Sequence, residues 1–215
     1  MARKVRIFVK DSSQHVILKS LDKLAIFQDE SDYMAFADIL RESSSNSALA
    51  VHAYVLMPHF FEFLATPSNE DALSKFMQSL GRKYVGYFNK KYNRVGTIFE
   101  GRYKSSLVED ERYLFDVMRY IEKLAPKGHP FSSIHKNLYG KKDEIVSYHD
   151  LYKKLGFTDE QRVEKYGELF NSDADNAKES FIKRCLEKQS VTGSEDFVKN
   201  LEKIVGISLT LKERG

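Results

Sequence analysis

Apolar positions recur along the first 125 residues in patterns that separate strands from helices. Short runs rich in β-branched and aromatic residues predict strands at 16–18, 48–57, 60–65 and 105–108. Apolar spacings of three and four predict helices over 29–42, from a capping box at Ser68 and Asp71 to about 89, and over 110–125. Pro58 predicts a hairpin turn between the second and third strands.

The order strand, helix, hairpin, helix, strand, helix is typical of an α+β fold. We therefore expect an antiparallel sheet with helices packed on one face. The rest of the chain is polar, shows no strand signal, and predicts short helices at 149–155, 159–170, 174–188 and 194–205. This change predicts two domains, an α+β domain over 1–140 and a small all-helical domain over 141–215.

Charge is distributed unevenly along the chain. The net charge is only +3, but residues 82–104 contain seven basic residues against Glu100 and so carry +6, which leaves −3 for the remainder. The basic residues are Arg82, Lys83, Lys90, Lys91, Arg94, Arg102 and Lys104, and six aromatic residues lie among them. Cations beside rings are typical of a surface that binds single-stranded nucleic acid. A solvated helix face whose rings belong to the core explains the same composition, so both interpretations stay open.

Composition indicates a cytoplasmic protein. No apolar run approaches the roughly 18 to 20 residues of a membrane helix. The single cysteine, Cys185, excludes an internal disulfide and fits a reducing compartment. Histidines such as His15 and His52 lie on predicted strands, where we expect packing or hydrogen bonding rather than metal ligation.

Several phrases of the sequence resemble one family when they are taken in order. They are VHAYVLMP at 51–58, FEGRYKSSLV at 99–108, RYL at 112–114, RYIE at 119–122, PFSS at 130–133, DLY at 150–152 and TGSEDFV at 192–198. In this order they resemble the REP-associated tyrosine transposases, a branch of the single-tyrosine HUH transposases, over nearly the whole chain.

The resemblance implies a ferredoxin-like core that binds single-stranded or hairpin DNA. In such enzymes two histidines on a strand and a polar residue on a helix hold a divalent metal, and a tyrosine attacks the scissile phosphate to form a 5′-phosphotyrosine link. A phenol with a pKa of about 10 needs that help at neutral pH. Tyr120 matches the nucleophile.

The chain departs from the family at the metal positions. Alignment on Met57-Pro58 places Phe60 and Glu62 at the two histidines, and the third ligand position falls on Leu124. Phe60 and Leu124 cannot bind a metal, whereas the Glu62 carboxylate suits Mg²⁺ or Mn²⁺. We expect no resident cofactor, and Mg²⁺ or Mn²⁺ only if the protein is active.

The resemblance also implies DNA contacts. Arg102, Tyr103 and Lys104 match the family's Gly-Arg-Tyr-Lys phrase, and Arg119 precedes the tyrosine. With the cations of 82–94 they form the predicted DNA-binding set: Arg82, Lys83, Lys90, Lys91, Arg94, Arg102, Tyr103, Lys104 and Arg119. A salt bridge to Glu100 or Glu122 is the alternative role of Arg102.

Three functions follow from these features. The first is a DNA-binding protein that recognises single-stranded or hairpin DNA without cleaving it. The second is an active metal-dependent transposase or nuclease acting through Tyr120, with Glu62 as the weak metal ligand. The third is a scaffold for protein contacts, which predicts that Phe60 and Phe61 form an exposed apolar patch. Oligomeric state, monomer or dimer, stays open.

Overall fold

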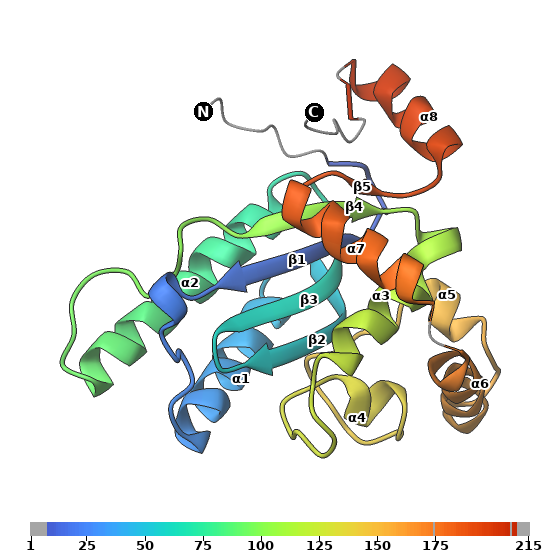
Figure 1. The fold of residues 1–215 in the computed structure, drawn as a ribbon. Coiled ribbons are helices and arrows are strands. Elements are labelled where there is room, and N and C mark those ends of the chain that lie inside the picture. The colour runs from blue at the N-terminus through green and yellow to red at the C-terminus, as the bar shows by residue number, and fades with distance from the viewer. Residues whose placement is uncertain (1–7, 174, 207, 210–215) are drawn as a thin grey trace.

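The computed structural model describes residues 8–173, 175–206 and 208–209 of the chain. Its strands are β1 (Gln14–Lys19), β2 (Leu49–Met57), β3 (Phe60–Pro67), β4 (Lys104–Val108) and β5 (Val191–Thr192). Its helices are a 3₁₀ turn (Leu21–Lys23), α1 (Glu30–Ser45), α2 (Ala72–Lys91), α3 (Asp110–Lys123), α4 (Ile134–Asn137), α5 (Asp150–Lys153), α6 (Asp159–Asn171), α7 (Asn176–Lys188) and α8 (Glu195–Val205). Figure 1 shows one sheet with helices around it.

The sheet has the strand order β2-β3-β1-β4-β5. β2 and β3 form the hairpin predicted around Pro58, β1 pairs antiparallel with both β3 and β4, and β5 pairs parallel with β4. Because side chains alternate along a strand, each strand sends one set of residues to either face. β1 and β3 are therefore the central strands that position side chains on both faces.

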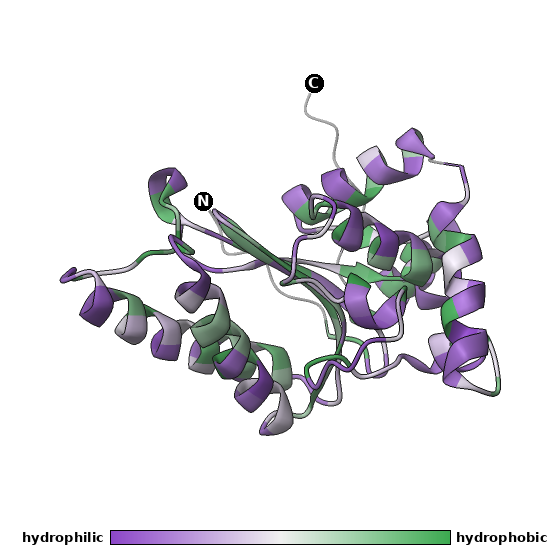
Figure 2. Ribbon diagram, turned by 90° about the horizontal axis from the view of Figure 1, so that it is seen from below, coloured by the Kyte–Doolittle hydropathy of each residue, from purple (hydrophilic) through white to green (hydrophobic). Residues whose placement is uncertain are grey.

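Two helical layers enclose the sheet. α1 and α2 cover one face, where residues such as Leu18, Phe61 and Phe63 meet Phe36 and Phe76. α3 covers the other face through Leu114, Val117 and Ile121, and α7 packs there against β1 and β4. Figure 2, which views the sheet close to edge-on, shows these helices on either side of it.

The predicted α+β class is confirmed, and its antiparallel strands β1 to β4 lie where the sequence indicates. Helices pack on the second face as well as the first, because α3 carries an apolar stripe of its own. The C-terminal part also contains β5, where no strand was predicted. The prediction of a capping box that begins at Ser68 is wrong, since Asp71 is the N-cap of α2 and makes no side-chain capping hydrogen bond.

Residues after 140 share their packing with residues before it. Tyr152, Tyr166 and Ile182 belong to the same buried cluster as Ala53 and Val55 of β2. The domain boundary near residue 140 stays a prediction. Within the described ranges, no helix is long and apolar enough to cross a membrane.

The outer edge of β2 is covered by the chain itself. The backbone N–H of Leu56 donates to the carbonyl of Phe131 at 3.0 Å, and that of Ser147 donates to the carbonyl of Val51 at 2.7 Å. Ser133 N–H donates to the carbonyl of Tyr54 between them, at 3.0 Å. At the opposite end of the sheet β5 pairs with the last two residues of β4.

Candidate active site and nucleic-acid interface

Tyr120 lies where α3 crosses the sheet. The helix presents its apolar stripe to β2 and β3, so Tyr120 sits half-buried at the margin of the stripe. Phe60 and Leu124, at two of the three family ligand positions, pack against the same hydrophobic cluster as Tyr120. The structure thus brings the tyrosine and the altered ligand positions together on one face.

Glu62, the third of these positions, is already bound by another residue. Its Oε1 lies 2.7 Å from Nε2 of His15 on the neighbouring strand β1. Glu62 is 2% exposed and His15 is fully buried. The His15 ring also contacts the Tyr120 ring edge-on, with centroids 5.7 Å apart. The carboxylate that could bind a metal is therefore held in a buried pair beside the tyrosine.

The environment of Tyr120 opposes its ionisation. Burial raises the pKa of its phenol well above the usual value, and the negative charges of Glu62, Glu187 and Glu179 raise it further. Glu179 and Glu187 belong to α7, which closes over this side of the sheet. A nearby positive charge would stabilise a phenolate, whereas the charged groups that shift the pKa of Tyr120 here are carboxylates.

The residues present do not fit the metal that the resemblance implies. The side chains of Phe60 and Leu124 have no ligating atom, and one of the two carboxylate oxygens of Glu62 is engaged by His15. No group of three or more His, Cys, Asp or Glu side chains suitable for a metal occurs among the residues that the structure describes. A divalent ion seldom stays bound to a single carboxylate without further ligands.

The predicted DNA-binding residues divide into several groups in space. Arg82, Arg102 and Tyr103 line one groove, between α2 and the segment 96–103. Arg82 and Arg102 are exposed, whereas Tyr103 is 8% exposed and forms part of the floor. Lys90 and Arg94 are exposed at the end of α2, and the Arg94 guanidinium lies 5.9 Å from the Phe88 ring centroid.

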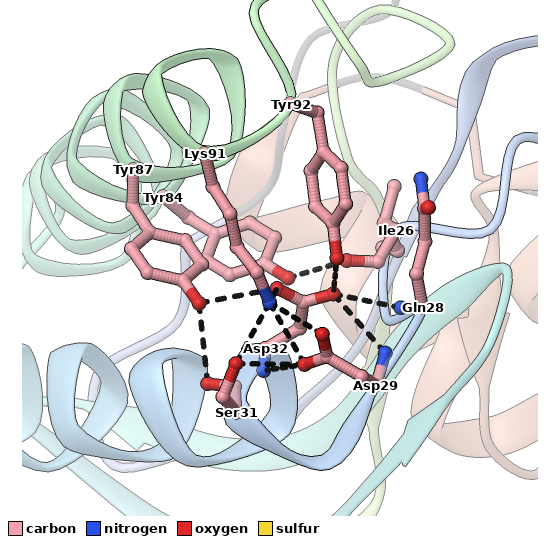
Figure 3. A network of polar contacts seen from close by, with 9 residues as sticks. All are labelled: Ile26, Gln28, Asp29, Ser31, Asp32, Tyr84, Tyr87, Lys91 and Tyr92. Carbon is pink, nitrogen blue, oxygen red and sulfur yellow. Dashed lines mark hydrogen bonds and ion pairs between the residues drawn. The ribbon is translucent and has the colours of Figure 1, made fainter.

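Lys91 is engaged by a polar network that joins the start of α1 to the end of α2 (Figure 3). Its ammonium donates to both carboxylate oxygens of Asp29 at 2.8 Å and to Oδ1 of the buried Asp32 at 2.7 Å. Tyr87 and Tyr92 donate to the two oxygens of Asp32 at 3.1 and 2.7 Å. Against the opposing effect of desolvation, these contacts raise the pKa of Lys91, and they engage its ammonium with the two carboxylates.

Three further cations of the predicted set have other surroundings. Lys83 pairs with Glu42 of α1 at 2.8 Å. Arg119 is 6% exposed, and its guanidinium contacts Asp116 at 3.3 Å and Ser172 Oγ at 2.8 Å. Lys104 is half-buried and pairs with Ile17 of β1, two residues from His15, so it lies on the tyrosine side of the sheet.

Glu122 does not pair with Arg102. Its carboxylate is fully buried and accepts hydrogen bonds from Ser133, Asn137 and Tyr166. Arg102 forms no ion pair within the described ranges, with Glu100 or any other residue. The guanidinium of Arg102 is therefore available to a ligand.

A scaffold for protein contacts would need an exposed apolar patch at Phe60 and Phe61, and the structure does not form one there. Phe61 is fully buried against Phe36, and Phe60 is half-buried in the cluster around Tyr120. That prediction is wrong because β3 is a central strand with helices on both of its faces.

His15 is the residue of this site that the sequence did not connect to it. The sequence predicts only that it is packed or hydrogen-bonded, which is what the structure shows. Its partner lies 47 residues away, and the contact depends on the register between β1 and β3, where Ile17 stands opposite Glu62. Strand alternation alone does not reveal such a cross-strand contact.

One solved structure supports this architecture. A solved structure of a REP-associated tyrosine transposase bound to a REP hairpin matches with a TM-score of 0.54 and 14% identity, over 69% of this chain and 93% of that one. At that identity the match shows the fold alone. A putative transposase from Deinococcus radiodurans R1 matches with a TM-score of 0.39 and 18% identity, over 57% of this chain and 97% of that one.

Among curated proteins, none matches this chain significantly. The model of the family described as transposase IS200-like matches residues 8–124, from before β1 to just after α3. This match covers more than half of the chain and includes the sheet strands β1 to β4 and the tyrosine helix. The chain belongs to the IS200-like transposase family.

Proposed function

We propose that this protein binds single-stranded or hairpin DNA and does not cleave it. The observation that carries the proposal is the state of the tyrosine site, where Glu62 is bound by buried His15 and the other two ligand positions are Phe60 and Leu124. Family membership supports DNA as the partner. Exposed arginines that have no acidic partner among the described residues, Arg82 and Arg102, support phosphate binding.

Loss of cleavage follows from the electrostatics of Tyr120. In-line attack on a phosphate requires a phenolate and a positive charge that stabilises both the nucleophile and the phosphate. Here the pKa of Tyr120 is raised by burial and by three carboxylates. A DNA phosphate brought to this face would add more negative charge. Binding therefore has support from the surface, whereas cleavage lacks its electrostatic requirement.

Fluorescence anisotropy with labelled oligonucleotides tests the binding. The solved structure that resembles this fold is of a transposase bound to a REP hairpin, so a hairpin with a single-stranded flank is the first probe. An unstructured single strand and a blunt duplex serve as comparisons. We expect salt-dependent binding to the hairpin or single strand. No binding to any of these DNAs at low salt would contradict the proposal.

A covalent-adduct assay tests the absence of cleavage. The protein is incubated with the same DNAs and Mg²⁺ or Mn²⁺, and the products are separated by denaturing electrophoresis. We expect no protein–DNA adduct, and equal DNA affinity for the protein and for Tyr120→Phe. An adduct that disappears in Tyr120→Phe would instead establish the second function, an active tyrosine transposase.

The retained tyrosine is the observation that keeps the active enzyme as a second proposal. Activity would require Glu62 to leave His15 and to bind a metal together with DNA phosphate. The triple variant Phe60→His, Glu62→His, Leu124→Asn supplies the family's ligands at these three positions. We expect this variant to bind Mn²⁺ in calorimetry while the unaltered protein does not. Mn²⁺ binding by the unaltered protein would favour the active enzyme.

A further inference from the structure

A groove lies on the face of the sheet opposite Tyr120. It has a volume of about 740 Å³, within the range of pockets that bind small ligands. One wall is the exposed side of α2, and the other is the segment 96–103 that leads into β4. Leu18, Phe99 and Tyr103 of its floor belong to the cluster under α1 and α2, whereas Tyr120 packs in the cluster on the other face. The groove is thus separate from the tyrosine site.

The rim of the groove is positively charged. Lys75, Arg82 and Arg102 line it, and Asp71 is its one acidic lining residue. Lys75 Nζ pairs with Asp71 at 3.1 Å, so these two charges largely cancel. The two arginines stand on opposite walls, one on α2 and one beside β4. This arrangement suits a ligand with more than one phosphate.

The floor of the groove is apolar, formed by Leu18, Met77, Val85, Phe99 and Tyr103. A phosphate alone would gain nothing from such a floor. Unpaired bases have apolar faces that a duplex keeps stacked inside, so a cationic rim above an apolar floor suits an unpaired strand better than a duplex. The segment that carries Arg102 is joined to α2 at its start, where Asn89 Nδ2 donates to the carbonyl of Gly96 at 2.8 Å.

Gly81 lines the groove from the middle of α2. Glycine in a helix interior is unfavourable relative to alanine. A glycine is usually found there because its φ is positive or because another group packs closely against its backbone. Neither applies here, because a Cβ at Gly81 would meet no atom within 4 Å and its φ is not positive. The absent side chain leaves the groove open.

We propose that this groove binds an unpaired stretch of DNA, with the phosphates held by Arg82 and Arg102 and the bases against the apolar floor. The inference rests on the proposed DNA-binding function and adds the site and its preference for unpaired over duplex DNA. It also places recognition on the face of the sheet away from Tyr120.

Charge removal is the first test. Arg82→Gln with Arg102→Gln should weaken binding to a single strand by at least about tenfold and lower the slope of log K against log salt by about 1.4, for two lost phosphate contacts. Lys165→Gln, at an exposed lysine of α6 that pairs with Glu168, is the control for removing a surface charge elsewhere, and it should leave both the affinity and the salt slope unchanged. Duplex binding should change far less than single-strand binding.

Filling the groove is the second test. Gly81→Met places a side chain in the groove and should reduce single-strand affinity about tenfold or more, by analogy with blocking any ligand pocket. Gly86→Met is the matched control, since Gly86 is also in α2, is exposed, and has no atom within 4 Å of a Cβ. Both variants should raise the melting temperature, because both remove a helical glycine.

These experiments distinguish failure of the groove proposal from failure of the proposed DNA-binding function. If the unaltered protein binds no DNA, the proposed function fails. If it binds but the arginine pair and Gly81→Met leave affinity unchanged, the groove proposal is overturned and DNA binding stands. Equal losses for single strand and duplex would overturn the preference for unpaired DNA.

Discussion

At the residue scale, Glu62 and Glu122 are buried carboxylates on the side of the sheet that carries Tyr120, and their hydrogen-bond partners differ in kind. Glu62 is bound by His15, a group that can share or carry a proton. Glu122 is bound by three neutral donors, Ser133 and Tyr166 at 2.7 Å and Asn137 at 2.8 Å. The first carboxylate is therefore stabilised by one directional partner, and the second by a neutral cage.

Glu62→Ala should destabilise the protein strongly. It leaves the buried His15 ring without its partner, and removing one partner of a buried pair costs about 3–5 kcal/mol. The free energy of unfolding from urea titrations measures the loss. The double variant His15→Ala, Glu62→Ala should lose less than the sum of the two single variants. Additive losses would contradict a coupled pair.

Glu122 predicts a pH dependence of stability. Burial raises the pKa of its carboxyl to about 7, against an opposing effect of the three hydrogen bonds. The folded state therefore binds this proton more tightly than the unfolded chain does. Stability from Glu122 is fully present below about pH 4.5 and is lost as the pH rises to about 7, by on the order of 3 kcal/mol.

Glu122→Gln tests this, because the amide stays neutral and keeps an oxygen for Ser133 and Asn137. We expect the unfolding free energy of the variant, relative to the unaltered protein, to rise between pH 5 and 8. A constant difference across this range would show that the carboxyl has an ordinary pKa.

At the element scale, the network around Asp32 fixes the end of α2 to the start of α1 (Figure 3). Asp29 and Asp32 form the capping box of α1, and Lys91 joins both carboxylates to α2. Since the segment after Lys91 becomes the wall of the groove, this network positions one side of the proposed binding site.

Lys91→Met should destabilise the protein, because the buried Asp32 carboxylate loses its cation. The pKa of Asp32 is lowered in spite of the opposing effect of burial, by Lys91, Tyr92 and backbone donors. Its stabilisation is therefore present above the ordinary Asp pKa and is lost as the pH falls below it. In Lys91→Met this loss should begin at higher pH. Lys90→Met, at the exposed neighbour, is the control for unfolding titrations across acidic pH.

Sequence patterns predict most elements of this fold because each is local. The apolar spacings of α2 and α3 and the alternation in β2 and β3 lie within single segments, and the structure has them near the predicted bounds. β5 has two residues, too few for any periodicity. The burial of Arg119 could not be predicted in this way, because it depends on α6 packing beside α3, and no local sequence pattern contains that contact.

At the scale of the whole molecule, the two faces of the sheet have different roles in the proposals. One face holds the half-buried Tyr120, with carboxylates near it, under α3 and α7. The other holds an open, basic groove beside α2. A loss of cleavage through changes at Phe60, Glu62 and Leu124 therefore need not disturb DNA binding.

The covering of β2 by residues 131–147 has a consequence for how many copies act together. Because its backbone groups are already bonded, the β2 edge cannot pair with a strand of a second copy, and we expect light scattering to detect no dimer built through this edge. A monomer has no two-fold axis. Since inverted repeats of two half-sites match the two-fold symmetry of a dimer, we do not expect the DNA target of a monomer to be one. Titrations should reach one protein per oligonucleotide with a Hill coefficient of about one, and a two-to-one complex would contradict this.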